Sequence, residues 1–191
     1  MSTSQTGETL QVHTIETAPE GSKALLEKST EAFGYIPNLH GVLAGSPGLL
    51  EAYKAIHGLF VNSSFDKDEL TVVWQAINVE HECHYCVPAH TAIAKSMGVD
   101  DAITDALRNK TELPSPKLEA LRKMTLAMVR KRGNVSNDEI QEFYSAGYNE
   151  RHLFDIILGL SQKTISNYTN HIAHTPIDAP FQKFAWKSET V

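Results

Sequence analysis

Apolar residues recur at helical spacing along most of this 191-residue chain, and that pattern restricts the fold more than any other feature. One face of the segment 117–131 illustrates the spacing, with Leu118, Leu121, Met124 and Met128 three or four residues apart. Such spacing is typical of an amphipathic helix that buries one side. Convincing strand alternation and repeats of about 30 residues are absent from the sequence. We therefore expect an all-α fold.

Helix start and stop signals divide this pattern into about eight helices. Asp66 with Glu69, and Ser136 with Glu139, have the spacing of capping boxes, and glycine or proline follows several of the segments. The expected helices cover residues 21–33, 47–60, 67–79, 86–97, 101–108, 117–131, 137–146 and 150–174. We expect them to form one helical-bundle domain over residues 19–176. Residues 1–18 are expected to be a flexible arm, and 177–191 a tail that packs on a neighbouring subunit.

Composition and charge exclude several classes of function. With 17 Lys and Arg against 23 Asp and Glu, the formal net charge is -6, so a general electrostatic grip on nucleic acid is not expected. The N-terminus lacks the basic and apolar regions of a signal peptide, and the apolar runs are too short to span a membrane. No glycine-rich phosphate loop supports a nucleotide cofactor. We expect a cytoplasmic protein without a cofactor, bound to neither nucleic acid nor membrane.

Both cysteines of the chain lie in one short segment, ECHYCVPAH, three residues apart at Cys83 and Cys86. Pro88 lacks a backbone N–H and fits only the first turn of a helix, so a helix should begin around residues 84–86. Cys86 would then lie at the positive end of the helix dipole, which favours its thiolate. The segment therefore predicts an activated thiol at a helix N-terminus.

His90 follows Cys86 by four residues and should share its helix face. This places the imidazole where it can pair with the thiol or deprotonate it, as in nucleophilic catalysis. Cys83 is one turn earlier, where it can form a disulfide with an oxidised Cys86. The spacing indicates a redox-active dithiol with an adjacent base.

Two other interpretations of the segment remain open. The cysteines could be buried without function, next to a histidine with its hydrogen bonds satisfied. They could also bind zinc together with His81, His84 or His90, although zinc prefers four protein ligands and the chain has no further cysteine. The redox interpretation is favoured because the pair and the histidine recur at helical spacing.

The segment CHYCVPAH resembles the alkylhydroperoxidase, or AhpD-like, branch of the carboxymuconolactone decarboxylase family. The preceding DELTVVWQAINVEHE, the following TAIAKSMGVD and the later SNYTNHIAHTPID extend the resemblance. It implies an all-helical fold, assembly into trimers or hexamers, and a hydroperoxide reductase cycle driven by a dithiol or protein reductant. By the same resemblance Cys86 is the peroxidatic cysteine, Cys83 the resolving cysteine and His90 part of the proton relay.

The sequence departs from this family pattern at two positions. A glutamate usually lies twelve residues before the first motif cysteine, where this chain has Thr71, which cannot act as an acid. Glu80 is the substitute we favour for the proton relay, and Glu69 is the other candidate. Tyr85 stands where the pattern often has a histidine, and it could donate a hydrogen bond or line the pocket.

The expected function is that of a thiol-dependent hydroperoxide reductase with an antioxidant role. The alternatives are a thiol–disulfide oxidoreductase or redox sensor, and a zinc-binding or structural oligomer. The cysteine pair argues against lactone decarboxylation, because acid–base decarboxylation gains nothing from two thiols. Asn167, Asn170, His171 and His174 recur on the last helix, where they could line a pocket near the cysteines or form a polar or subunit-contact face.

Overall fold

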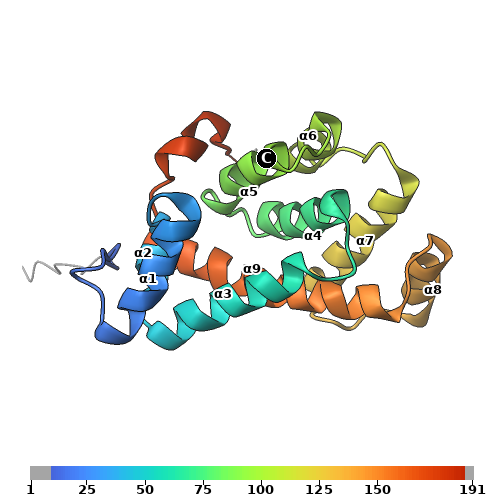
Figure 1. Cartoon of the computed structure of the whole chain (residues 1–191). Helices are drawn as coiled ribbons and strands as arrows, with labels where there is room; N and C mark the ends of the chain where they lie inside the picture. Colours follow the sequence, from blue (N-terminus) through green and yellow to red (C-terminus); the bar gives the residue numbers. More distant parts are fainter. Residues whose placement is uncertain (1–9, 188–191) are drawn as a thin grey trace, which may run out of the picture.

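The predicted helices form, and residues 10–187, which the computed structural model describes, contain no strand (Figure 1). The helices are α1 (Glu20–Phe33), α2 (Asn38–Leu43), α3 (Pro47–Val61), α4 (Lys67–Glu80), α5 (Cys86–Ser96), α6 (Asp101–Arg108), α7 (Pro116–Arg130), α8 (Asn137–Ser145) and α9 (Glu150–Ala173), followed by the 3-10 helix η1 (Ala179–Phe184). The all-helical expectation is confirmed. None of these helices is long and apolar enough to cross a membrane.

Two of these elements, α2 and η1, have no counterpart among the expected helices. Each contains only six residues, which is too short for a helical period to stand out in a sequence. All but the first residue of α2 are buried, so tertiary contacts and not local propensity hold this helix.

Helix α4 lies at the centre of the molecule and packs against α5, α6, α7 and α9. Its residues from Glu69 to Val79 are all buried, which explains why its apolar pattern extends around the whole helix. Phe60 from α3 and Trp74 from α4 pack edge to face in this core, as expected for apolar residues at helical spacing. Because α5 and α9 both flank α4, residues from these three helices meet at one place.

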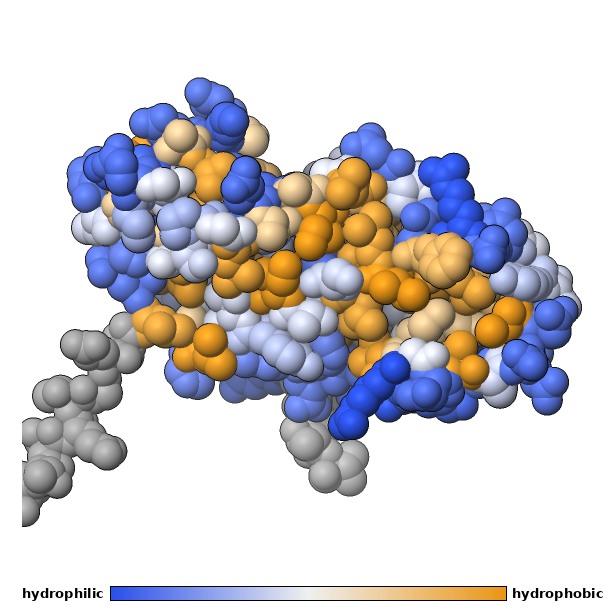
Figure 2. Space-filling model, turned by 90° about the horizontal axis from the view of Figure 1, so that it is seen from below, coloured by the Kyte–Doolittle hydropathy of each residue, from blue (hydrophilic) through white to orange (hydrophobic). Residues whose placement is uncertain are grey.

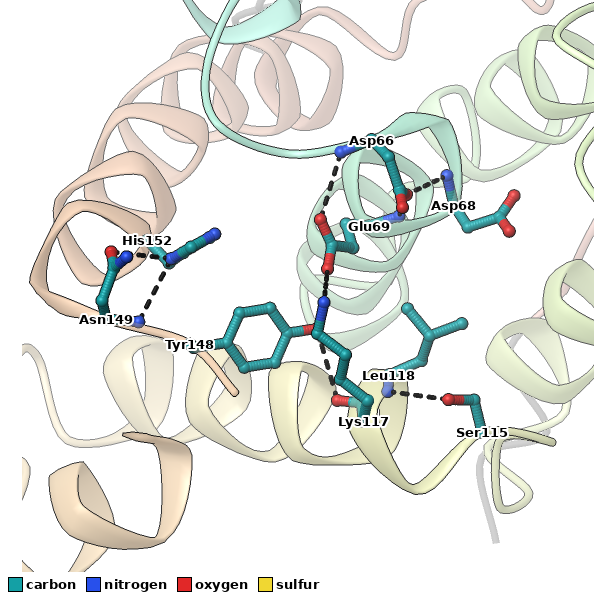
Figure 3. A network of polar contacts seen from close by, with 9 residues as sticks. All are labelled: Asp66, Asp68, Glu69, Ser115, Lys117, Leu118, Tyr148, Asn149 and His152. Atoms are coloured by element: carbon teal, nitrogen blue, oxygen red, sulfur yellow. Dashed lines mark hydrogen bonds and ion pairs between the residues drawn. The ribbon is translucent and has the colours of Figure 1, made fainter. Parts of the chain in front are cut away.

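The N-terminus of α4 is fixed by the predicted capping box and tied to α7 (Figure 3). Asp66 accepts hydrogen bonds from the first turn of α4, while Glu69 Oε2 accepts one from the Asp66 N–H. The other oxygen of Glu69 binds Lys117 Nζ on α7 at 2.8 Å, and Lys117 also lies over the Tyr148 ring. Figure 3 shows the Glu69 carboxylate between the α4 backbone and the Lys117 ammonium. Glu69 is thus engaged in capping and inter-helix pairing.

The two ends of the chain lie closer to the domain than their composition suggested. The part of the expected flexible arm that the structure describes is anchored, because His13 N–H donates to Gly41 O at 3.0 Å and Ala18 is buried. The remainder of the arm, residues 1–9, lies outside the described residues. The tail packs on its own chain, with η1 against α5 and Arg108 Nη1 donating to Phe184 O at 3.1 Å. Its contact with a neighbouring subunit stays a prediction.

Candidate functional site

The turn between α4 and α5 brings the two cysteines together. Helix α5 begins at Cys86, as the position of Pro88 predicted. The N–H of Cys86 donates to Cys83 Sγ at 3.2 Å, so one sulfur caps the helix that begins at the other. Both thiols are free and almost fully buried, with 0% of Cys83 and 1% of Cys86 exposed. The arrangement is a dithiol held at a helix N-terminus.

The surroundings of Cys86 favour its thiolate. Burial alone would raise its pKa, but a hydrogen bond from Cys83, the charge of Lys163 and a hydrogen bond from Asn170 lower that pKa to about 5. The Asn170 Nδ2–H donates to the Cys86 sulfur at 3.2 Å. The hydrogen bond to Cys86 and burial raise the pKa of Cys83. The pKa values of the two thiols are therefore shifted in opposite directions, so that the thiolate is favoured at Cys86 and the thiol at Cys83.

Lys163 on α9 is the residue of this site that the sequence analysis missed. Its side chain is fully buried, and its Nζ lies 2.9 Å from His90 Nε2. Burial lowers its pKa, while interaction with the Cys86 thiolate counteracts that shift. A signal was present in the sequence, since this lysine is seven residues from both Ile156 and Asn170 and therefore lies on the same buried face of α9.

His90 lies next to Lys163 and not in a hydrogen bond with Cys86. The imidazole lines the same cavity as the thiol, but its Nε2 is engaged by Lys163 and its Nδ1 is buried without a partner. Burial and the charge of Lys163 lower the His90 pKa well below its usual value, so the ring is neutral. The expected direct pair of Cys86 and His90 is replaced by an arrangement in which Lys163 interacts with both.

A cavity of about 410 Å³ opens onto this cluster. Cys86, His90 and Lys163 form part of its wall, whereas Cys83 does not. Apolar and aromatic side chains supply most of the rest, and no Asp or Glu is among the described residues that line it. The volume lies within the range of pockets for small organic ligands, and the lining favours an apolar one.

Two further histidines of the cavity wall are kept neutral by burial. Burial and nearby Lys54 lower the pKa of His40 to about 3, and burial and nearby Lys163 lower that of His57 to about 4. Gln162 links His57 to the core, because its Nε2–H donates to His57 Nδ1 and its Oε1 accepts from the indole of Trp74. The cavity wall therefore presents neutral imidazole rings together with three lysines, Lys28, Lys54 and Lys163.

The Tyr85 hydroxyl reaches the segment that follows α9. It donates to Asp178, the residue that precedes η1, and also accepts from the Leu39 N–H at 3.4 Å. Burial and the Asp178 carboxylate raise the pKa of Tyr85. Tyr85 lines the cavity, as one of its two expected roles required, and it connects the motif to the C-terminal segment.

The structure does not bring Glu80 to the dithiol. Both oxygens of its carboxylate bind Arg130 of α7, at 2.7 and 2.8 Å, and this pairing lowers the Glu80 pKa. Thr71, at the position of the missing family glutamate, is buried and donates to Lys67 O within its own helix. Glu69 is engaged with Lys117, so neither glutamate considered from the sequence has a contact with the dithiol, and the proton-relay role of Glu80 stays a prediction without geometric support. A residue at the end of a helix need not face the next turn, and Glu80 faces α7.

The four polar residues that the sequence analysis singled out on α9 do not share one environment. Asn170 reaches Cys86, and Asn167 donates to Asn78 Oδ1 at 3.0 Å, so both amides lie within the site. His171 and His174 are half-buried and exposed, respectively, and do not line the cavity. The asparagines therefore lie beside the dithiol, but none of these four side chains lines the cavity.

Residues 10–187 contain no group of three or more His, Cys, Asp or Glu side chains placed to hold a metal ion. Of the proposed zinc ligands, His81 Nδ1 lies 2.9 Å from Asn167 Oδ1, and His84 Nε2 lies 3.2 Å from Thr175 O. Both rings are thus engaged by neighbouring polar groups. This geometry gives the zinc alternative no support.

No protein-family model and no curated protein matches the chain. Solved structures do match, among them the following two. One is an uncharacterized peroxidase-related protein of Ralstonia eutropha JMP134, described as an alkylhydroperoxidase AhpD core, with a TM-score of 0.78, 20% identity, and coverage of 90% of this chain and 92% of that one. The other is an uncharacterized peroxidase-related protein of Silicibacter sp. TM1040, with a TM-score of 0.73, 18% identity, and coverage of 95% and 97%.

The likeness to both structures extends over nearly the whole of each chain, so it concerns the complete arrangement of helices and not one motif. It agrees with the all-helical architecture of the described residues. This chain therefore has the AhpD-like fold of the peroxidase-related proteins.

Proposed function

We propose that the protein is a thiol-dependent reductase of organic hydroperoxides with an antioxidant role. The observation that carries the proposal is the Cys86 sulfur in the wall of an apolar cavity, next to Cys83 and stabilised as a thiolate. A thiolate is the form of cysteine that attacks a peroxide, and the cavity has the size of a small organic molecule.

In the proposed cycle, the Cys86 thiolate attacks the distal oxygen of the hydroperoxide. An S–O bond forms and the O–O bond breaks, which gives Cys86 sulfenic acid and an alkoxide that takes up a proton to become the alcohol. Cys83 then attacks the sulfenic sulfur, and a disulfide and water form. A small cellular dithiol that enters the cavity, or a protein reductant for which the site opens, returns both cysteines to the reduced state and is itself oxidised to a disulfide.

The geometry favours a small oxidant over a protein disulfide. Cys86 is only 1% exposed and lines a cavity, while Cys83 is completely buried. A disulfide on a folded protein cannot approach a sulfur in this position without opening the site, whereas a hydroperoxide can enter the cavity. The thiol–disulfide oxidoreductase is therefore the second candidate.

The test is hydroperoxide consumption by the reduced protein with dithiothreitol as the electron donor. We expect the wild type to turn over and Cys86→Ser to lose consumption. After removal of dithiothreitol, Cys83→Ser should consume one equivalent of hydroperoxide and accumulate a sulfenic acid that dimedone traps. Ser136→Ala, a capping-box variant of α8 remote from the cavity, is the control for handling and stability.

Consumption unchanged in Cys86→Ser would overturn the proposal. Rapid exchange with a protein disulfide, without reaction toward hydroperoxides, would select the second candidate. Stoichiometric zinc with no titratable thiols would select a metal-binding protein instead.

A further inference from the structure

A fully buried lysine is an unusual neighbour for a peroxidatic thiol. Lys163 has no exposed surface, and no carboxylate is found among the described residues that line its cavity. Burying an unpaired charge is costly, so its ammonium needs an anion close by. The Cys86 thiolate is the anion that the site provides, and the two groups interact. Both side chains line the same cavity, and in the proposed starting state they form an ion pair.

The first step of peroxide reduction requires an acid as well as a thiolate. The leaving alkoxide is a strong base, so its departure is aided by proton transfer in the transition state. The cavity histidines are neutral, and the phenols of Tyr53 and Tyr85 are buried with raised pKa values. The ammonium beside Cys86 is therefore the best-placed proton donor among the described residues.

His90 holds this donor in position. Its Nε2 lies 2.9 Å from Lys163 Nζ, and its ring packs against Trp74 with centroids 4.8 Å apart, so the imidazole is fixed. Because Nε2 accepts from the ammonium, the neutral ring carries its proton on Nδ1, which is buried without a partner. The pair of Lys163 and His90 would take over the role that the family resemblance gives to a glutamate, at whose position this chain has Thr71.

We propose that Lys163 is the general acid of the reaction and donates its proton to the leaving alkoxide, with His90 as its positioning residue. This inference rests on the proposed function. As the Cys86 sulfur bonds to the distal oxygen and the O–O bond breaks, the ammonium proton moves to the alkoxide oxygen. The products are the alcohol, Cys86 sulfenic acid and a neutral amine.

The neutral amine then serves the second step. It takes the proton of Cys83, whose thiolate attacks the sulfenic sulfur, and it returns that proton to the departing hydroxide to give water. Reduction of the disulfide by a dithiol supplies two protons and two electrons, and the proton of Cys86 passes to Lys163. The ion pair is thereby restored with atoms and electrons in balance.

The experiment separates proton donation from activation of the thiol. Oxidation of Cys86 is measured in single turnovers with tert-butyl hydroperoxide, which leaves as an alkoxide, and with peracetic acid, which leaves as a carboxylate and needs no proton. Rates for the wild type and Lys163→Met are divided by the fraction of Cys86 thiolate, determined from iodoacetamide alkylation against pH. We expect the variant to lose about 100-fold with the alkyl hydroperoxide and less than about tenfold with the peracid.

Lys54→Met is the matched control, because Lys54 lines the same cavity but donates to Leu25 O and Ser29 Oγ. In Lys54→Met, the ratio of the oxidation rates with tert-butyl hydroperoxide and with peracetic acid should equal the wild-type ratio. Equal losses with both oxidants in Lys163→Met would overturn the inference and leave the proposed function intact. A wild type that reacts with neither oxidant would overturn both.

A measurement on the wild type keeps the inference testable if Lys163→Met does not fold. Donation of a proton to the leaving group predicts that the oxidation rate depends weakly on the acidity of the leaving alcohol across a series of hydroperoxides. A steep dependence would contradict the role of Lys163.

Discussion

Asn170 determines, together with Lys163, how nucleophilic Cys86 is. Its Nδ2–H donates to the thiol sulfur, while its Oδ1 is buried without a partner. An amide that donates to sulfur stabilises the thiolate more than the thiol, since hydrogen bonds to charged groups are the stronger ones. The side chain is thus part of the reason why the pKa of Cys86 is lowered to about 5.

We predict that Asn170→Ala raises the pKa of Cys86 by about one unit, because a hydrogen bond to a charged group contributes about 1.5 kcal/mol. The measurement is the iodoacetamide alkylation rate of the Cys86 peptide between pH 4 and pH 9. The wild-type rate should be half-maximal near pH 5 and the variant's at higher pH. Asn134→Ala, whose side chain bonds Lys131 O outside the site, is the control. An unchanged midpoint would contradict this role.

The residues of the site differ in how far the sequence could reveal them. Cys83, Cys86 and His90 lie within eight positions, so helical spacing alone places them together. Lys163 lies 73 positions after His90 in the chain, and only the packing of α9 against α4 and α5 brings it to the thiol. Glu80 was predicted from proximity in sequence, but its carboxylate faces Arg130 because the direction of a terminal side chain depends on the neighbouring helix.

Among the helices, α9 illustrates how close packing positions the site. A Cβ on Gly159 would lie 2.7 Å from Phe60 Cε2 and 3.0 Å from Val73 Cγ1, so only glycine allows α3 and α4 to approach α9 here. One turn later, the same helix carries Lys163 into the cavity. The position of Lys163 in the cavity therefore depends on the close packing of α3 and α4 against α9 at Gly159.

We predict that Gly159→Ala lowers the free energy of unfolding by about 1–3 kcal/mol, because the added methyl group forces Phe60 from its packed position. Gly58→Ala is the matched control: it lies inside α3 with nothing within 4 Å of its Cβ position. The control should be neutral or more stable by up to about 1 kcal/mol, because alanine favours helices. Urea unfolding measures both, and equal effects in the two variants would contradict the packing argument.

The helices that have a long apolar face or a capping signal could be predicted from the sequence. The capping boxes at Asp66 and Ser136 form as predicted, and α9 covers nearly its whole expected length. By contrast, α2 was not predicted, because six residues present less than two turns of pattern and are stabilised by burial. The same holds for η1, which is positioned by the contact of Tyr85 with Asp178.

At the scale of the whole molecule, one face remains apolar without being covered. Helices α3 and α9 run along the underside of the molecule in Figure 1, and Figure 2 shows hydrophobic side chains gathered across this face. The exposed large apolar side chains on these two helices are Leu49, Leu59, Val61, Phe154, Ile157, Tyr168 and Ile172. Contiguous apolar surface of this kind is typical of an interface. The expectation of a homo-oligomer, a trimer or hexamer, thus has a candidate surface.

We predict that the wild type is an oligomer in solution, with a mass of at least twice the 21.1 kDa of one chain. Leu59→Glu should shift this mass toward that of the monomer. Leu59 is 62% exposed on α3, so a charge there is tolerated in the monomer but disfavoured in an apolar interface. Ala102→Glu, an exposed position on α6, is the control. Light scattering after size exclusion measures the masses. A monomeric wild type would contradict the prediction.

The central claim is that Cys86 and Cys83 form a dithiol that reacts with hydroperoxides. The most direct measurement is mass spectrometry of the reduced, metal-free protein after one equivalent of an organic hydroperoxide. We predict a loss of two hydrogens that maps to a disulfide between Cys83 and Cys86. An unchanged mass, with both thiols still titratable, would contradict the claim.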